Sequence, residues 1–95
     1  MAITMKRYPN NPILGPDRTQ PWEAQAVFNG CPVRDENGYH LLYRALAQPT
    51  TDDKTGVTFA QSTIGYAFSP NGYCFDGERR QLIAPQEPWE RYGCE

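Results

Sequence analysis

Two polar side chains interrupt the most apolar part of this 95-residue sequence, and they are its best candidates for binding chemistry. Asn29 breaks an apolar run that begins at Ala24, and Arg44 lies near the end of a second run that begins at Tyr39. An amide can both donate and accept hydrogen bonds, whereas a guanidinium offers a planar set of donors. If the two runs are neighbouring strands of one sheet, the pair forms the start of a site for a hydroxyl-rich ligand.

Each of the two residues also has a simpler interpretation. Asn29 precedes Gly30, and an asparagine in such a bend often bonds its own backbone. Arg44 lies in a run that is apolar on both predicted faces, so a buried guanidinium there needs either a counter-charge or a ligand. From the residues alone, a ligand and a structural salt bridge are equally good explanations for Arg44.

The elements that would position this pair are two antiparallel strands and a tight turn. Residues 24–33 and 39–46 are rich in β-forming residues, and the segment between them closes on Asn37-Gly38, a strong hairpin signal. Asn29-Gly30 is predicted to form a bend or bulge within the first strand. Pro32 has no N–H to donate, which places that strand at an edge or an interruption of the sheet.

The remaining segments complete a small all-β unit. Residues 1–23 carry four prolines and are expected to form an extended arm, pinned to the body by Ile13 and Leu14. Further strands are predicted at 62–68 and 81–84, with a long polar loop over 48–59. The sequence therefore predicts four antiparallel strands within 24–85 and a segment, 86–95, that leaves the sheet.

Composition and charge limit the classes of function. The net charge is −2 and the basic residues are scattered, which argues against nucleic-acid binding. No apolar run approaches the roughly 20 residues that span a bilayer, and the first residues do not form a secretion signal. We therefore expect no membrane partner and a cytoplasmic location.

The cysteines and the single histidine do not predict a metal site. Cys31, Cys74 and Cys94 are odd in number and lack Cys-x-x-Cys spacing, so buried free thiols are expected. His40 alternates with apolar residues on a predicted strand, where a partly exposed histidine is commoner than a ligand without partners.

Six short segments, in the same order and at similar spacing, resemble the N-terminal part of glycoside hydrolase family 130, which comprises β-mannoside phosphorylases and related β-mannosidases. The segments are Asn10-Asn11-Pro12-Ile13-Leu14, Val27-Phe28-Asn29, Tyr39-His40-Leu41-Leu42-Tyr43-Arg44-Ala45, Ser62-Thr63-Ile64-Gly65-Tyr66-Ala67, Ser69-Pro70-Asn71-Gly72 and Gly93-Cys94-Glu95. The resemblance covers nearly the whole chain. It implies an N-terminal extension followed by the first four-stranded blade of a five-bladed β-propeller, with 86–95 as a linker toward the second blade.

The resemblance also implies a reaction and a set of site residues. Phosphate would attack a β-mannoside with inversion and release α-mannose 1-phosphate, or water would attack in a hydrolytic member. Asn29 and Arg44 match positions that contact the mannose ring, and Glu95 is expected either to bind substrate or to orient the acid that follows it in the family. The family pattern continues with Asp-Pro-Arg, whose aspartate is the general acid, so no catalytic residue is expected within the chain and no turnover by it alone.

The implied partners are a β-mannoside oligosaccharide and inorganic phosphate as co-substrate, with no cofactor; a homo-oligomer of the complete protein stays open. One rival interpretation is a non-catalytic β domain that binds sugar or protein through Trp22, Tyr66 or Trp89. Trp22 is expected to pack at the sheet rim rather than to bind sugar. Another rival is a different five-bladed glycosidase, such as an arabinanase or fructosidase relative, although those carry an acidic residue where this chain has Asn29.

Overall fold

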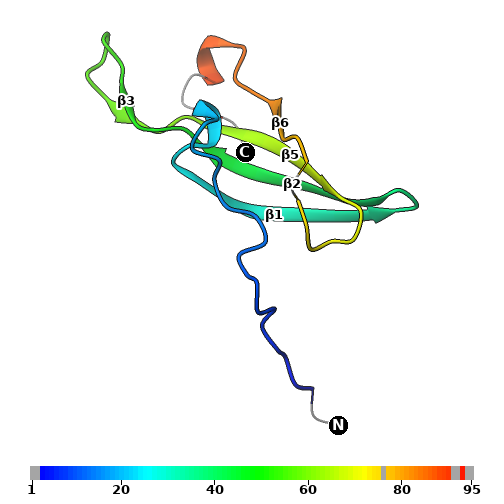
Figure 1. Cartoon of the computed structure of the whole chain (residues 1–95). Helices are drawn as coiled ribbons and strands as arrows, with labels where there is room; N and C mark the ends of the chain where they lie inside the picture. Colours follow the sequence, from blue (N-terminus) through cyan, green and yellow to red (C-terminus); the bar gives the residue numbers. More distant parts are fainter. Residues whose placement is uncertain (1–2, 76, 91–92, 94–95) are drawn as a thin grey trace.

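The chain folds around one antiparallel sheet in a computed structural model that describes residues 3–75, 77–90 and 93 (Figure 1). The sheet has four strands in the order β1-β2-β5-β6. The elements are η1 (Pro21–Glu23), β1 (Ala26–Asp35), β2 (Gly38–Leu46), β3 (Thr50–Thr51), β4 (Thr58–Phe59), β5 (Ser62–Ser69), β6 (Arg80–Ile83) and η2 (Pro88–Glu90), where η is a single 3-10 turn. The predicted all-β class and the four antiparallel strands are confirmed. Neither 3-10 turn is long and apolar enough to cross a membrane, and the described residues contain no longer helix.

The β1–β2 hairpin closes as its Asn-Gly signal predicts. Asp35 pairs with Gly38, and its Oδ1 accepts the backbone N–H of Asn37 at 2.8 Å and of Gly38 at 3.2 Å. Gly38 has a φ of 144°, and a Cβ there would lie 2.7 Å from the carbonyl oxygen of Ser69. Only glycine fits this position, because any side chain would meet both an unfavourable φ and the backbone of β5.

The predicted bulge in β1 is also present. Phe28 pairs with Arg44 and Cys31 pairs with Leu42, so the two residues between them, Asn29 and Gly30, together oppose a single residue of β2. Asn29 takes a φ of 55°, which asparagine tolerates better than most residues. β1 is an edge strand, which explains how it accommodates a proline.

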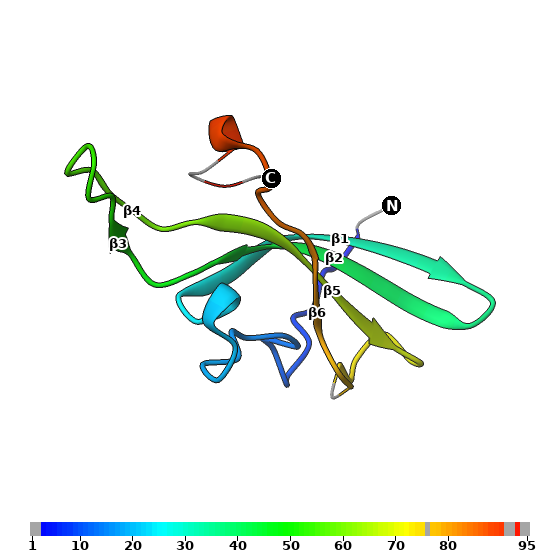
Figure 2. The ribbon, with the colours of Figure 1, turned by 90° about the horizontal axis from the view of Figure 1, so that it is seen from above.

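One face of the sheet is covered by the N-terminal arm and η1, as Figure 2 shows. Leu14 and Trp22 pack there against a cluster of buried residues, so both packing predictions are confirmed, whereas Ile13 remains 38% exposed. The buried residues of this cluster are Tyr43, Ala45, Ala67 and Phe75. The core is therefore small and lies between the arm and the middle of β2 and β5.

The opposite face of the sheet is open to solvent. Cross-strand pairing places Phe28, Leu42 and Ile83 on this face, and 37%, 36% and 53% of their surfaces are exposed. A sheet with one covered face normally carries polar residues on the other. Here the second face is apolar in several places, which is typical of a surface that packs against another layer.

Three details differ from the sequence-based expectation. The 48–59 segment is not a simple loop, because Thr50–Thr51 and Thr58–Phe59 pair as a short second hairpin. The 86–95 segment does not simply leave the sheet: Gly93 returns to form a parallel bridge with Ser62. The domain boundaries at 23 and 85 stay a prediction.

The expectation of buried thiols is wrong for Cys31 and Cys74, which are both free and exposed. Cys31 follows the bulge on the open face, where no second layer covers it. Cys74 lies just after the Asn71-Gly72 turn, which brings Phe75 rather than Cys74 into the core. Cys94 lies outside the described residues.

Candidate functional site

The two candidate residues, Asn29 and Arg44, line one pocket on the open face of the sheet. The pocket has a volume of about 370 Å³. Its lining residues are Asn29, Cys31, Leu42, Tyr43, Arg44 and Ile64. The structure therefore brings together the amide and the guanidinium that the sequence singled out. Glu95, the third predicted site residue, lies outside the described residues.

Arg44 is held along the pocket by neighbours on both adjacent strands. Its Nε donates a hydrogen bond to Ser62 Oγ at 2.6 Å, and its guanidinium carbon lies 4.9 Å from the centre of the Phe28 ring. A cation above an aromatic face and a bond to a neutral hydroxyl both orient the charge without neutralising it. These contacts orient the guanidinium along the pocket.

Asn29 reaches the pocket because of the bulge. The residue is exposed, and its side chain forms no hydrogen bond with any residue of the described part of the chain. Its backbone carbonyl accepts a weak contact from Cys31 Sγ at 3.9 Å. The alternative in which the Asn29 side chain is occupied by its own turn is therefore not what the structure shows, and the amide faces solvent.

The chemistry of the pocket suits binding rather than proton transfer. Leu42 and Ile64 supply apolar surface, and Asn29 and Arg44 supply donors and an acceptor at its edge. A pyranose has the same two characters, with C–H surface on its faces and hydroxyls around its rim. No carboxylate or histidine is among the described residues that line the pocket, so these residues supply no general acid or base.

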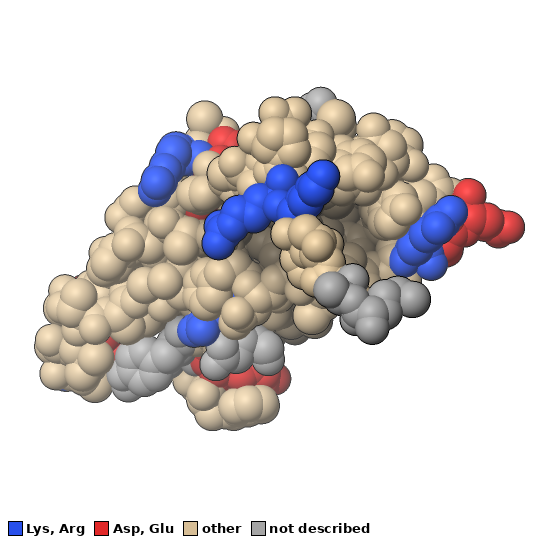
Figure 3. Space-filling view, turned by 90° about the horizontal axis from the view of Figure 1, so that it is seen from below, with Lys and Arg blue, Asp and Glu red and all other residues tan. Residues whose placement is uncertain are grey.

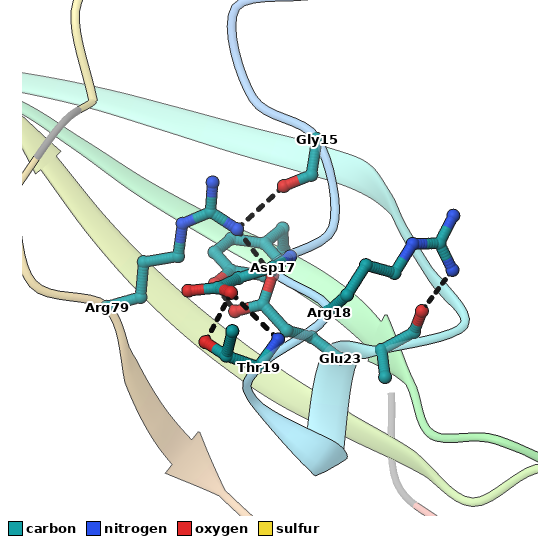
Figure 4. A network of polar contacts seen from close by, with 8 residues as sticks. Gly15, Asp17, Arg18, Thr19, Glu23 and Arg79 are labelled. Carbon is teal, nitrogen blue, oxygen red and sulfur yellow. Dashed lines mark hydrogen bonds and ion pairs between the residues drawn. The ribbon is translucent and has the colours of Figure 1, made fainter.

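A second polar cluster, which sequence reasoning missed, lies on the covered face around Glu23 (Figure 4). The Glu23 side chain is completely buried. Its Oε2 accepts Nη1 of Arg79 at 2.5 Å and the backbone N–H of Asp17 at 3.1 Å, and its Oε1 accepts the Tyr43 hydroxyl at 3.1 Å. Arg79 Nη1 also donates to the carbonyl of Gly15 at 2.7 Å. The carboxylate therefore joins the arm, β2 and the β5–β6 connection.

Tyr43 keeps its proton in this cluster. Burial, followed by the nearby charge of Glu23, raises the pKa of the Tyr43 hydroxyl far above its ordinary value of 10.0. The hydroxyl is thus a donor to the Glu23 carboxylate at every physiological pH.

A third cluster lies at the turn end of the hairpin. His40 Nε2 lies 2.8 Å from Asp35 Oδ2, and His40 Nδ1 lies 2.6 Å from the Tyr66 hydroxyl. The Asp35 side chain is 45% exposed and that of His40 is 27% exposed, as expected for a strand histidine at the surface. This cluster has only one histidine and one carboxylate, and no group of three metal-ligating side chains occurs in residues 3–75, 77–90 and 93.

The surface charges visible in Figure 3 do not form a further site. On the face shown in Figure 3, the described Lys and Arg side chains lie in several separate places rather than in one continuous patch. Of the aromatic residues considered as sugar platforms, Trp22 stacks on Tyr43 with ring centres 6.3 Å apart, and Tyr66 lies under Arg80 at 5.0 Å. Trp89 is 80% exposed.

Comparison with known proteins identifies relatives but no matching family model. The chain is 34% identical to a β-1,2-mannobiose phosphorylase of Thermoanaerobacter sp. (strain X514) over 96% of its own length. It is 32% identical to a 1,2-β-oligomannan phosphorylase of the same strain over 98% of its length. The chain spans 31% and 30% of these two relatives, about a third of each. Over nearly all of its residues it is therefore similar to mannoside phosphorylases.

Proposed function

We propose that this chain is the N-terminal, sugar-binding part of a glycoside hydrolase family 130 enzyme that cleaves β-mannosides by phosphorolysis. The observation that carries the proposal is that Asn29 and Arg44, at positions where the family contacts mannose, line one pocket. The names of the two relatives favour phosphorolysis over the hydrolysis that the sequence left open.

The proposed reaction exchanges one bond for another. A phosphate oxygen attacks the anomeric carbon of the terminal mannose, the β-glycosidic C–O bond breaks, and the departing oxygen takes a proton from a general acid. Inversion makes the product α-mannose 1-phosphate. The described pocket residues hold the mannosyl ring in this scheme, and the proton donor is a carboxylate that is not among the described residues lining this pocket. Glu95 is proposed to bind substrate beside them.

We further propose that the sheet is the first blade of a five-bladed propeller. The exposed apolar residues Phe28 and Ile83, which do not line the pocket, support this, because a second sheet packed on them would remove them from water. The exposed thiols of Cys31 and Cys74 fit a reducing compartment, which supports a cytoplasmic protein.

The alternative of a non-catalytic sugar- or protein-binding domain is favoured by one observation, the 80% exposed ring of Trp89. The two candidates differ in which surface binds sugar. Substitution Trp89→Ala abolishes carbohydrate binding in the alternative and leaves it unchanged in the phosphorylase proposal.

The decisive experiment compares Arg44→Ala with a matched control, Arg34→Ala, in the complete enzyme. Both arginines lie over an aromatic ring on the β1–β2 hairpin, at 4.9 Å and 5.6 Å, but only Arg44 lines the pocket. With β-1,2-mannobiose and phosphate, Arg44→Ala lowers kcat/KM by about 100-fold or more, as expected when a reacting ring is misplaced. Arg34→Ala stays within about twofold, since Arg34 is exposed and does not line the pocket.

Product analysis completes this test. Phosphate-dependent release of mannose 1-phosphate supports the proposal. Free mannose released without phosphate would replace phosphorolysis with hydrolysis, and equal rates for the two arginine variants would remove Arg44 from the site.

A further inference from the structure

The turn η1 contacts Tyr43 both at its ring and at its hydroxyl. Trp22 stacks on its ring with centres 6.3 Å apart, and Glu23, the next residue, accepts its hydroxyl at 3.1 Å. Gly65 of β5 lies directly against both rings: an added Cβ there would lie 2.5 Å from Tyr43 and 2.8 Å from Trp22. The Tyr43 side chain therefore has one position, fixed by stacking, by a buried bond and by close packing against β5.

Glu23 itself is held in place by groups from separate parts of the chain. Arg79, from the β5–β6 connection, balances its charge, and the backbone N–H of Asp17 fills another acceptor position. Figure 4 shows Arg79, on the segment that leads into β6, and Gly15 and Asp17, on the arm, beside Glu23. A buried carboxylate with a cation and two neutral donors is satisfied, and it has little freedom to move.

Tyr43 connects this cluster to the sugar pocket. It is adjacent to Arg44 on β2, is itself one of the residues that line the pocket, and opposes the bulge that carries Asn29. Arg44 and Asn29 are thus held by the segment of β2 around Tyr43, which η1 contacts from the covered face. A rotation of β2 at Tyr43 would move both of them, since neighbouring strand residues share one backbone twist.

We propose that Glu23 is a positioning residue for the sugar pocket: through Tyr43 it fixes the segment of β2 and the bulge of β1 that present Arg44 and Asn29. This inference deepens the proposed function and rests on it for the identity of the ligand. The geometric part, that Glu23 controls the setting of Arg44, is independent of any ligand.

The test uses the whole chain and a signal that needs no substrate. Arg44 Nε–H donates to Ser62, so its NMR cross-peak and its hydrogen-exchange rate report how the guanidinium is held. Glu23→Gln keeps the shape of the side chain and removes its charge. We expect it to raise the exchange rate of Arg44 Nε–H by about tenfold, the effect of losing one ordinary hydrogen bond.

The matched control is Asp35→Asn, which makes the same carboxylate-to-amide change in the cluster at the opposite end of the hairpin. It leaves Arg44 exchange within about twofold, because Asp35 touches neither Tyr43 nor the pocket. A rise counts only where it exceeds the change in global opening, which the slowest-exchanging backbone amides of each variant report. If Glu23→Gln does not fold, Tyr43→Phe keeps the ring and removes only the donor, and the same rise is expected.

Two results would overturn the inference. In one, Glu23→Gln and Tyr43→Phe loosen the arm, seen as a change in the near-ultraviolet signal of Trp22, while Arg44 exchange stays at the wild-type rate. In the other, Asp35→Asn raises Arg44 exchange as much as Glu23→Gln does. The same variants are titrated with β-1,2-mannobiose, and we expect Glu23→Gln to weaken binding by about tenfold. A wild-type chain that binds no mannoside counts against the proposed function, and the exchange rates still decide the positioning role.

Discussion

Two clusters in this small sheet use the same kinds of side chain in opposite surroundings. Each contains a carboxylate, a basic side chain and a tyrosine hydroxyl. Glu23 bonds both Arg79 and Tyr43, whereas Asp35 bonds His40, which in turn bonds Tyr66. The first carboxylate is completely buried, and the second is 45% exposed. The first lies on the covered face, across β2 from the pocket of Asn29 and Arg44, and the second lies at the turn end of the hairpin.

The difference teaches that burial, rather than the number of bonds, decides what each cluster contributes. Water can replace a lost partner of Asp35, so its contacts add little stability. Water cannot reach the buried Glu23 to replace a lost partner, so that cluster holds three segments of the chain in fixed relative positions. The following predictions test this contrast, in order of decreasing effect.

The largest effect is expected for Glu23→Ala. It leaves the Arg79 guanidinium and the Tyr43 hydroxyl without their acceptor in the interior, and we expect a loss of about 3 kcal/mol in the free energy of unfolding. Urea denaturation measures it. Because the remaining charge causes much of this loss, the double variant Glu23→Ala/Arg79→Met should recover part of it. Asp35→Ala is the matched control, and a loss as large as that of Glu23→Ala would contradict the contrast.

A smaller loss is expected for Gly65→Ala, which probes the packing around Tyr43 without touching a charge. The added Cβ would lie 2.6 Å or less from the Tyr43 ring, and overpacking of this kind costs about 1–3 kcal/mol. Gly77→Ala is the control, since a Cβ there meets nothing within 4 Å. Equal midpoints in thermal unfolding for the two variants would show that Tyr43 is not tightly held.

The cluster of Asp35, His40 and Tyr66 is expected to contribute to the pH dependence of the free energy of unfolding. The backbone N–H of Asn37, and secondarily His40, lower the pKa of Asp35 below its ordinary value of 3.8. A carboxyl whose pKa is lower in the folded state stabilises the fold above pH 3.8, and this contribution is lost as the pH falls through the folded-state pKa. Asp35→Asn should therefore flatten part of the decline in thermal stability below pH 4, and an unchanged acid profile would contradict this.

The smallest effect is expected for Cys31→Ser. The thiol is exposed and makes only a weak contact with the Asn29 carbonyl, so stability should change by less than about 0.5 kcal/mol. Its position in the pocket matters more than its packing. In a Cys74→Ser/Cys94→Ser background, β-1,2-mannobiose should slow the alkylation of Cys31, and an unchanged rate with saturating sugar would place the sugar elsewhere.

The parts of the fold that depend on local pattern were predictable from sequence. The run of β-forming residues at 39–46 predicted β2, Asn37-Gly38 predicted the hairpin turn, and Asn29-Gly30 predicted the bulge. Each signal rests on a local backbone preference that few residues share. The presence of Asn29 and Arg44 in one pocket followed from these predictions, because adjacent strands bring their side chains together.

The parts that depend on contacts distant in sequence were not predictable. Glu23 and Arg79 are separated by 56 positions, and no periodicity marks a charged residue that will be buried. The bridge from Gly93 to Ser62 depends in the same way on where the tail returns. The exposure of Cys31 follows from the open face, which composition cannot reveal. Nothing in a single sequence marks Glu23, which follows an aromatic residue in a 3-10 turn, as a fully buried carboxylate.

The most direct test of the central claim, that Asn29 and Arg44 form one mannose-binding pocket, is an NMR titration of the chain with β-1,2-mannobiose. The account predicts that the side-chain signals of Asn29 and Arg44 shift together along one saturating curve, while those of Arg34 do not move. Asn29→Ala should weaken this binding by about 1–3 kcal/mol, the cost of leaving a polar group of the sugar without a partner. Shifts centred on Trp89, with Asn29 and Arg44 unchanged, would contradict the account.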